Sequence, residues 1–123
     1  MTPINLADKF ALFSDHWNPR IVVELNGQHV KLVKFQGEFV WHHHAAEDEL
    51  FLVISGSFRM EFHDESGEHS RTINEGEFIV VPRGVEHRPV AEKEVLVLLF
   101  EPAAIFHTGN VQSDIAVADP GWI

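Results

Sequence analysis

Three consecutive histidines, His42, His43 and His44, are the part of this sequence with the clearest capacity for chemistry. Side chains of an extended segment alternate between two faces, so His42 and His44 would point the same way and His43 the opposite way. Glu49 follows five residues after His44. Two histidines and one carboxylate on one face suit non-haem iron and similar divalent metals. We therefore predict a metal site at these residues, with His43 outside it.

His87 is a fourth candidate ligand. It closely follows Pro82 and Gly84, which predict a tight turn that aims the strand after it. The other five histidines have no partner pattern, and we interpret them as surface residues: His16, His29, His63, His69 and His107.

Two motifs around these residues resemble those of the cupin superfamily. The first motif is matched by Gly37-x4-His42-x-His44-x4-Glu49-x6-Gly56, and the second by Gly76-x5-Pro82-x-Gly84-x2-His87. Nineteen residues separate the two, as is typical of small single-domain cupins. The resemblance implies a small jelly-roll β-barrel with a divalent metal inside. The ligands that it implies are His42, His44, Glu49 and His87.

Two positions depart from the family pattern. Gly37 stands one residue closer to the first histidine than is usual. A shift to His43 would place Ala45 at the partner position, so His42 and His44 remain the expected pair. Ala91 replaces an Asn that often closes the second motif, but that Asn is not usually a metal ligand.

The elements that must position these residues are expected to be short strands. Asn26-Gly27 predicts a hairpin between residues 20–25 and 28–35, because both turn positions favour positive φ. Strands separated by turns every 8–12 residues or so predict an all-β sandwich or barrel. The further extended segments are expected at 38–44, 50–54, 58–62, 78–81 and 95–100, with a polar loop at 64–69.

The two ends of the chain are expected to lie outside a barrel of about residues 20–101. Asn5 can cap a short helix that runs to Phe13, with Leu6 and Phe10 at helical spacing. Residues 102–123 lose the strand pattern, and we expect a tail packed on the outside or on a second subunit. The length of 123 residues fits a single domain, 1–123.

Composition limits the partners and the chemistry. A formal charge of −10 argues against nucleic acid or an anionic membrane surface as partner. The longest apolar run, 95–100, is too short to span a membrane, and no signal peptide is apparent, so we expect a cytoplasmic protein. The absence of cysteine excludes disulfides and thiolate ligands.

The expected pocket beside the metal is apolar. Phe51 and Val53 share the face of Glu49. Arg83, in the turn near the mouth, is a candidate for orienting a carboxylate ligand. The remaining lining candidates are Phe39, Phe58, Met60, Phe62, Phe78 and Phe100. Such a cavity favours a small, partly apolar ligand.

Three functions fit these observations. The first is a metal-dependent enzyme, dioxygenase- or isomerase-like, acting on a small organic molecule. The second is a non-catalytic module that binds or senses a small ligand, and the third is an interaction protein with a vestigial site. The metal, whether Fe, Mn, Ni, Co, Cu or Zn, is not fixed by imidazole and carboxylate ligands. We also expect a homodimer that covers an exposed sheet edge.

Overall fold

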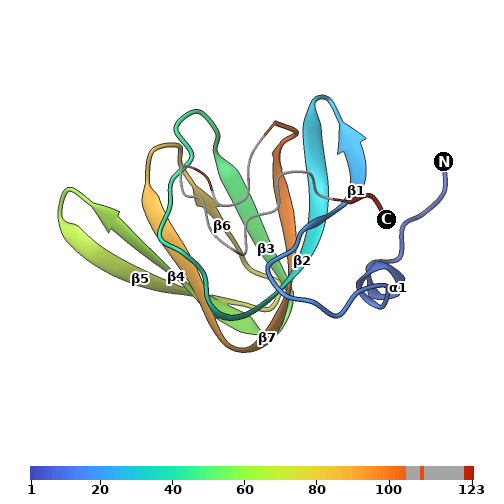
Figure 1. Ribbon diagram of the computed structural model, residues 1–123, viewed down its shortest axis with the longest axis horizontal. Coiled ribbons are helices and arrows are strands. Elements are labelled where there is room, and N and C mark those ends of the chain that lie inside the picture. Colours follow the sequence, from blue (N-terminus) through green and yellow to red (C-terminus); the bar gives the residue numbers. More distant parts are fainter. Residues whose placement is uncertain (105–108, 110–120) are drawn as a thin grey trace.

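The computed structural model of the protein describes residues 1–104, 109 and 121–123. Among these, one short helix precedes seven strands that pair antiparallel with one another (Figure 1). The expected all-β jelly roll with a short N-terminal helix is confirmed. The elements are α1 (Leu6–Phe10), β1 (Arg20–Leu25), β2 (Gln28–Glu38), β3 (Glu49–Ser55), β4 (Ser57–Asp64), β5 (Gly67–Asn74), β6 (Phe78–Val81) and β7 (Glu86–Pro102).

Strand β7 belongs to both parts of the sheet. Its second half lies between β2 and β3, which gives the order β1-β2-β7-β3-β6. Its first half pairs with β4, and β4 pairs with β5. The strand bends away between these halves near Glu92–Glu94, which are exposed and interrupt its apolar pattern. The bend curves the sheet around an interior (Figure 1).

Local sequence signals explain the N-terminal elements. Asn26 and Gly27 have φ values of 50° and 78°, as a tight hairpin turn requires, and they join β1 to β2 as expected. The Asn5 side chain accepts a hydrogen bond from the backbone N–H of Asp8 at 2.9 Å and caps α1. The helix was expected to run to Phe13, but it ends at Phe10.

The expected strand at 38–44 is wrong. After Glu38 the regular β2–β7 ladder ends, and the backbone bonds that follow to β7 are isolated ones that form no strand. Phe39 N–H donates to Pro89 O, and His42 exchanges two bonds with His87. The spacing of His42 and His44 could not show that this segment is no strand. An extended segment with one isolated β-bridge points alternate side chains to the same face, as a strand does.

Strand β5 was missed, since most of the expected loop at 64–69 and the residues after it form the β4–β5 hairpin. Only Ile73 of this strand is buried, so no apolar alternation marks it. Strand β7 is also longer than the expected segment 95–100, because Glu92–Glu94 mask its continuity.

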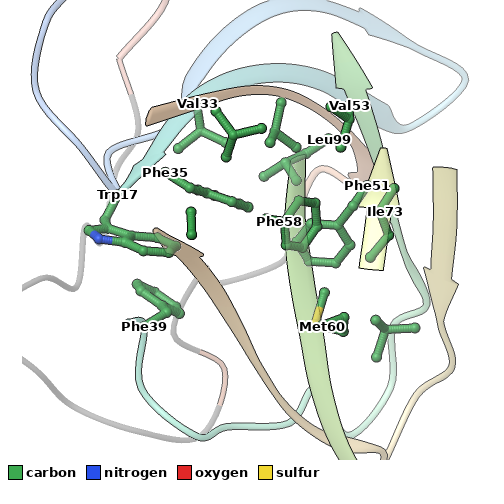
Figure 2. Close-up of a cluster of buried hydrophobic side chains, with 14 residues drawn as sticks. Trp17, Val33, Phe35, Phe39, Phe51, Val53, Phe58, Met60, Ile73 and Leu99 are labelled. Atoms are coloured by element: carbon green, nitrogen blue, oxygen red, sulfur yellow. The ribbon is translucent and has the colours of Figure 1, made fainter. Parts of the chain in front are cut away.

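The interior is filled by aromatic and β-branched side chains (Figure 2). Trp17 lies at one end, stacked on Phe35 and Phe39 with ring centroids 4.5 and 4.8 Å away. Its φ of 62° is unusual for a bulky residue and costs energy. The indole N–H donates to Gln36 O at 2.9 Å, which satisfies this buried donor.

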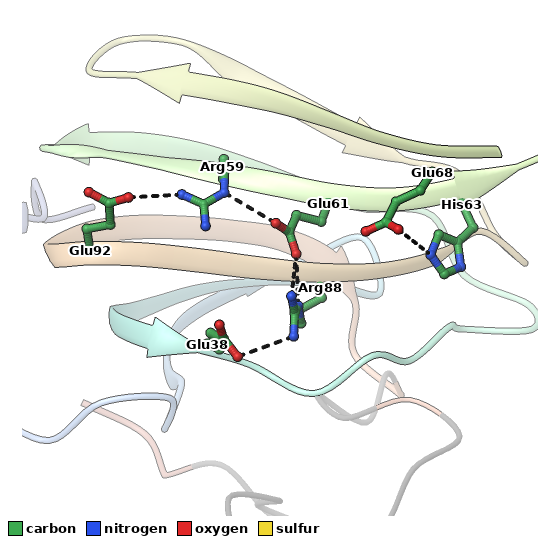
Figure 3. Close-up of polar contacts among 7 residues, drawn as sticks. All are labelled: Glu38, Arg59, Glu61, His63, Glu68, Arg88 and Glu92. Atoms are coloured by element: carbon green, nitrogen blue, oxygen red, sulfur yellow. Dashed lines mark hydrogen bonds and ion pairs between the residues drawn. The ribbon is translucent and has the colours of Figure 1, made fainter.

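The outer surface near the bend carries charged side chains (Figure 3). Arg88 of β7 donates to Glu61 of β4 at 2.6 and 3.0 Å and to Glu38 of β2 at 3.3 Å. Arg59 reaches Glu61 and Glu92. The paired charges stand on the face opposite the core and link three strands.

The described part of the C-terminal region packs against β1. Gly121 O accepts from Ile21 N–H, and Ile123 N–H donates to Ile21 O. The rest of the expected tail, including His107, lies outside the described residues. No helix in the described ranges has the length and hydropathy needed to cross a bilayer.

Replacing Trp17 with Ala should lower the free energy of unfolding by about 3 kcal/mol or more, because a large buried ring leaves a cavity. Urea denaturation measures this loss. Trp122→Ala is the matched control: its side chain is 61% exposed, so a loss below about 1 kcal/mol is expected. Equal losses in both variants would contradict the packing role given to Trp17.

Candidate metal centre

Four side chains meet inside the barrel: His42, His44, Glu49 and His87. Each offers one nitrogen or oxygen atom, and these atoms all lie within 4.8 Å of one another. All four residues are buried, with 0–5% of their surface exposed. The structure therefore brings together every residue that the sequence predicted for the metal site.

The two motifs are joined through their backbones. His42 N–H donates to His87 O at 3.0 Å, and His87 N–H donates to His42 O at 2.8 Å. Gly84 N–H donates to His44 O at 2.8 Å, so the turn before β7 also holds the histidine loop. Gly84 has a φ of 82°, which an L side chain rarely adopts, and this explains why the turn contains glycine.

Backbone carbonyls fix the orientation of two imidazoles. His42 Nδ1 lies 2.9 Å from Val40 O, and His87 Nδ1 lies 2.8 Å from Val85 O. A carbonyl oxygen can only accept, so each Nδ1 carries the proton and donates it. Each Nε2 is then left with a free lone pair, the form in which a neutral imidazole binds a metal.

Within the part of the chain that the structure describes, three buried polar atoms of the site have no hydrogen-bond partner: His44 Nε2, His87 Nε2 and Glu49 Oε1. The Glu49 oxygen lies 3.3 Å from the His44 nitrogen and 3.7 Å from the His87 nitrogen. Buried groups are rarely left unpaired, because each costs about 1–3 kcal/mol.

A divalent ion would satisfy these atoms. Ligands on opposite sides of one ion are about 4.2 Å apart when each bond is about 2.1 Å, so a maximum separation of 4.8 Å needs only a small contraction. The side chains thus form a nitrogen and oxygen site that could hold a divalent transition metal.

The protonation states of the site residues favour the binding of a cation. Burial, with the neighbouring His87, lowers the pKa of His42 to about 3, so its imidazole is neutral at pH 7. Burial alone would raise the pKa of Glu49, but the close polar groups of His44 and His87, with a contribution from Glu101, hold it well below its usual value. The site therefore offers neutral imidazole and an ionised carboxylate.

An apolar pocket opens beside these ligands. It is small, with about 20 Å³ of space for the centres of water molecules. Its residues come from β2, β3, β7 and the loops, and they are Trp17, Pro19, Val33, Phe35, Phe39, His42, Glu49, Phe51, Pro89 and Leu99. Gly109 also reaches this region, because a Cβ added there would come within 3.1 Å of His42 Cδ2.

Residues 28–101 match the model of the family described as Cupin domain. That range is more than half of the chain and contains all four converging side chains. The chain belongs to the cupin family. A curated relative, the uncharacterised protein YdbB of Bacillus subtilis (strain 168), is 34% identical over 67 residues. The match spans 54% of this cupin and 57% of YdbB.

Solved structures show the same fold. A cupin-2 domain containing protein from Shewanella frigidimarina NCIMB 400 is 46% identical, with a TM-score of 0.76 over 80% of this cupin and 93% of that chain. The hydroquinone 1,2-dioxygenase PnpCD, in complex with Cd²⁺ and 4-hydroxybenzonitrile, is 23% identical. It has a TM-score of 0.64 over 76% of this cupin and 69% of that chain, a likeness of fold alone.

Several expectations about the surroundings of the site need correction. Phe78 is 62% exposed on β6 and Phe100 faces outward on β7, so neither lines the pocket as expected. Arg83 is exposed, with its Nε 3.5 Å from the carboxylate of Asp48. His43 turns away from the other two histidines, as expected, and its Nδ1 lies 3.0 Å from Glu86 Oε2.

The sequence reasoning missed several residues of this cupin's interior, Trp17, Lys31 and Glu101 among them, and it wrongly placed His29 at the surface, although only 7% of that residue is exposed. Trp17 precedes the first strand, and no spacing relates it to the motifs. Lys31 and Glu101 are buried and paired at 2.9 Å. Their alternation with Val33 and with Leu99 on the strands was a signal that could have placed them inside.

The stability of the metal-free protein should fall as pH drops below about 6.5. The unfolded chain then protonates His42, with an ordinary pKa near 6.5, while the folded pKa of about 3 keeps it neutral. The free energy of unfolding is therefore unaffected by the protonation of this histidine above pH 6.5. Between pH 6.5 and pH 3 it falls by at most about 1.4 kcal/mol per pH unit. Urea midpoints in EDTA from pH 7.5 to 4 measure it.

The variant His42→Gln removes this group and should flatten the curve over that range. His63→Gln, which replaces an exposed histidine on β4, is the matched control and should follow the wild type. Parallel curves for wild type and His42→Gln would contradict the prediction.

Proposed function

We propose that the protein is a metal-dependent enzyme, dioxygenase- or isomerase-like, that acts on a small and partly apolar organic molecule. The observation that carries this proposal is the meeting inside the barrel of three ligand atoms that have no hydrogen-bond partner among the described residues: His44 Nε2, His87 Nε2 and Glu49 Oε1. With His42 they make four ligands, which would leave two positions open on an octahedral ion. Open positions are what separates a catalytic metal site from a closed structural one.

The aromatic walls of the pocket favour a substrate that has an apolar or aromatic ring. Phe39 lies against His42 with ring centroids 5.3 Å apart, and Phe51 lies 6.3 Å from His87. These rings would exclude water from one side of the ion and pack against an apolar substrate. A bound divalent ion would supply Lewis-acid or oxygen chemistry there.

Hydroquinones are the first substrates to test for a dioxygenase. Structures of hydroquinone 1,2-dioxygenases share the fold, which supports the choice without fixing the reaction. The pocket has room for little more than one water molecule, so a ring of that size would have to displace side chains or bind at its mouth.

The proposal predicts one divalent ion per chain and oxygen uptake with a small phenolic substrate. Protein loaded separately with Fe²⁺, Mn²⁺, Co²⁺, Ni²⁺, Cu²⁺ or Zn²⁺ would be analysed for metal content and then tested with hydroquinones, catechols and diketones in an oxygen electrode. Sugar and keto–enol isomerisation would be followed in parallel. His42→Ala should lose both the ion and turnover.

His43→Ala is the matched control, because this neighbouring histidine faces Glu86 and should leave metal content unchanged. Wild-type protein that takes up no ion would overturn the proposal. Tight ligand binding without turnover of any substrate would support a sensing module instead, and that alternative rests on the same pocket.

We also propose that the protein is a homodimer that buries the outer apolar face, which we define as two cross-strand rows on β2, β7, β3 and β6. Neither row contains a charged side chain. Phe10 and Phe13 cover the Leu32 end, while Phe78 and Val80 at the other end are 62% and 46% exposed. The rows are Val30, Phe100, Leu50 and Val80, and Leu32, Leu98, Leu52 and Phe78.

Light scattering after size exclusion should therefore give twice the mass of one chain, which is 14.0 kDa. Phe78→Glu places a charge on the outer apolar face and should shift the protein toward monomer. Leu12→Glu alters an equally exposed residue, at 64%, that belongs to neither row, and it should remain dimeric. A wild-type monomer would contradict the dimer.

A further inference from the structure

We propose that Lys31 and Glu101 act as a positioning pair that holds the Glu49 carboxylate in place for metal binding. This inference rests on the proposed metal-dependent function and assigns a role to two residues that are not among the four candidate ligands. Both residues are 1% exposed, and Lys31 Nζ lies 2.9 Å from Glu101 Oε1. Lys31 is the one buried lysine or arginine among the described residues.

Strand register places Glu101 directly beside Glu49. Leu50 of β3 pairs with Phe100 of β7, so the next residues outward on these antiparallel strands, Glu49 and Glu101, stand opposite each other. Both point into the interior, on the face of Phe51 and Leu99. The ligand carboxylate therefore has the histidines on one side and the Glu101 carboxyl on the other.

Lys31 completes the row from β2. It pairs with Leu99, one inward-facing position from Glu101, and such diagonal neighbours are within reach of a long side chain. The result is a buried line of ammonium, carboxyl and ligand carboxylate across β2, β7 and β3. In that line Lys31 Nζ holds the Glu101 carboxyl at 2.9 Å, and Glu101 in turn stands beside the Glu49 carboxylate.

Fold stability does not explain the pair. Burying ionisable groups costs several kcal/mol of desolvation for each one that is charged, and apolar residues of similar volume often serve a core as well or better. Neither oxygen of Glu101 makes a well-formed hydrogen bond within the described residues, even with Lys31 nearby. Groups that hold a metal ligand in place typically change affinity by about 10–100-fold when removed.

Two variants test the role, and only the first of them leaves the buried charge of Lys31 without its partner. Glu101→Gln keeps the side-chain shape. The double variant Lys31→Met/Glu101→Leu replaces the pair with apolar residues and should fold, since no unpaired charge remains. Zn²⁺ affinity would be measured by competition with a chelator, and the visible spectrum of the Co²⁺ form would report the ligand geometry.

Zn²⁺ should bind the variants about 10–100-fold more weakly than the wild type, and the Co²⁺ spectrum should change. A merely structural role would alter thermal stability equally with and without metal and leave both readouts unchanged. Glu24→Gln is the matched control, because this residue of β1 pairs with His29 of β2 at 2.9 Å and does not touch the ligands.

The outcomes separate the two proposals. Wild-type affinity and an unchanged Co²⁺ spectrum in the folded double variant would overturn the positioning role alone. Wild-type protein that binds neither Zn²⁺ nor Co²⁺ would overturn the proposed function, and the positioning role with it.

Discussion

The site depends on the pairing of β7 with three different strands. The second half of β7 is hydrogen bonded to β2 and β3, and the first half to β4. His87 lies near the start of this strand and Glu101 near its end, so the curvature of one strand brings both toward Glu49 on β3. A straight β7 would leave these residues more than 40 Å apart along its length, at about 3.3 Å per residue.

Burial of polar atoms is the second constraint. The carbonyls of Val40 and Val85 each accept a hydrogen bond from one ring nitrogen, that of His42 and that of His87, and the apolar rings around them keep water away. The backbone thereby decides which imidazole nitrogens face the interior. What remains unpaired is a set of lone pairs directed at a common point, and this is why the geometry favours a cation.

The candidate site could be predicted from the sequence more fully than the fold around it. The spacing of the histidines and the glycine and proline in the turns are local features of the sequence, and they determine where these side chains point. The four residues found together were therefore the four expected. The strand β5 and the long β7 could not be delimited, because exposed or charged residues remove their alternation. Lys31 and Glu101 were missed because a single charged residue in a strand is ordinarily a surface residue. The metal's identity, the reaction, the cytoplasmic location and the dimer stay predictions.

The stack of Trp17 on Phe39 has a spectroscopic consequence. Phe39 also touches the ring of His42, so the indole is separated from the ligands by a single aromatic ring. The chain contains no tyrosine, and its ultraviolet emission comes from three tryptophans, of which Trp122 is largely in water. Blue-shifted emission would then report mainly on the interior, and Trp17 would be a built-in optical probe of whatever occupies the pocket.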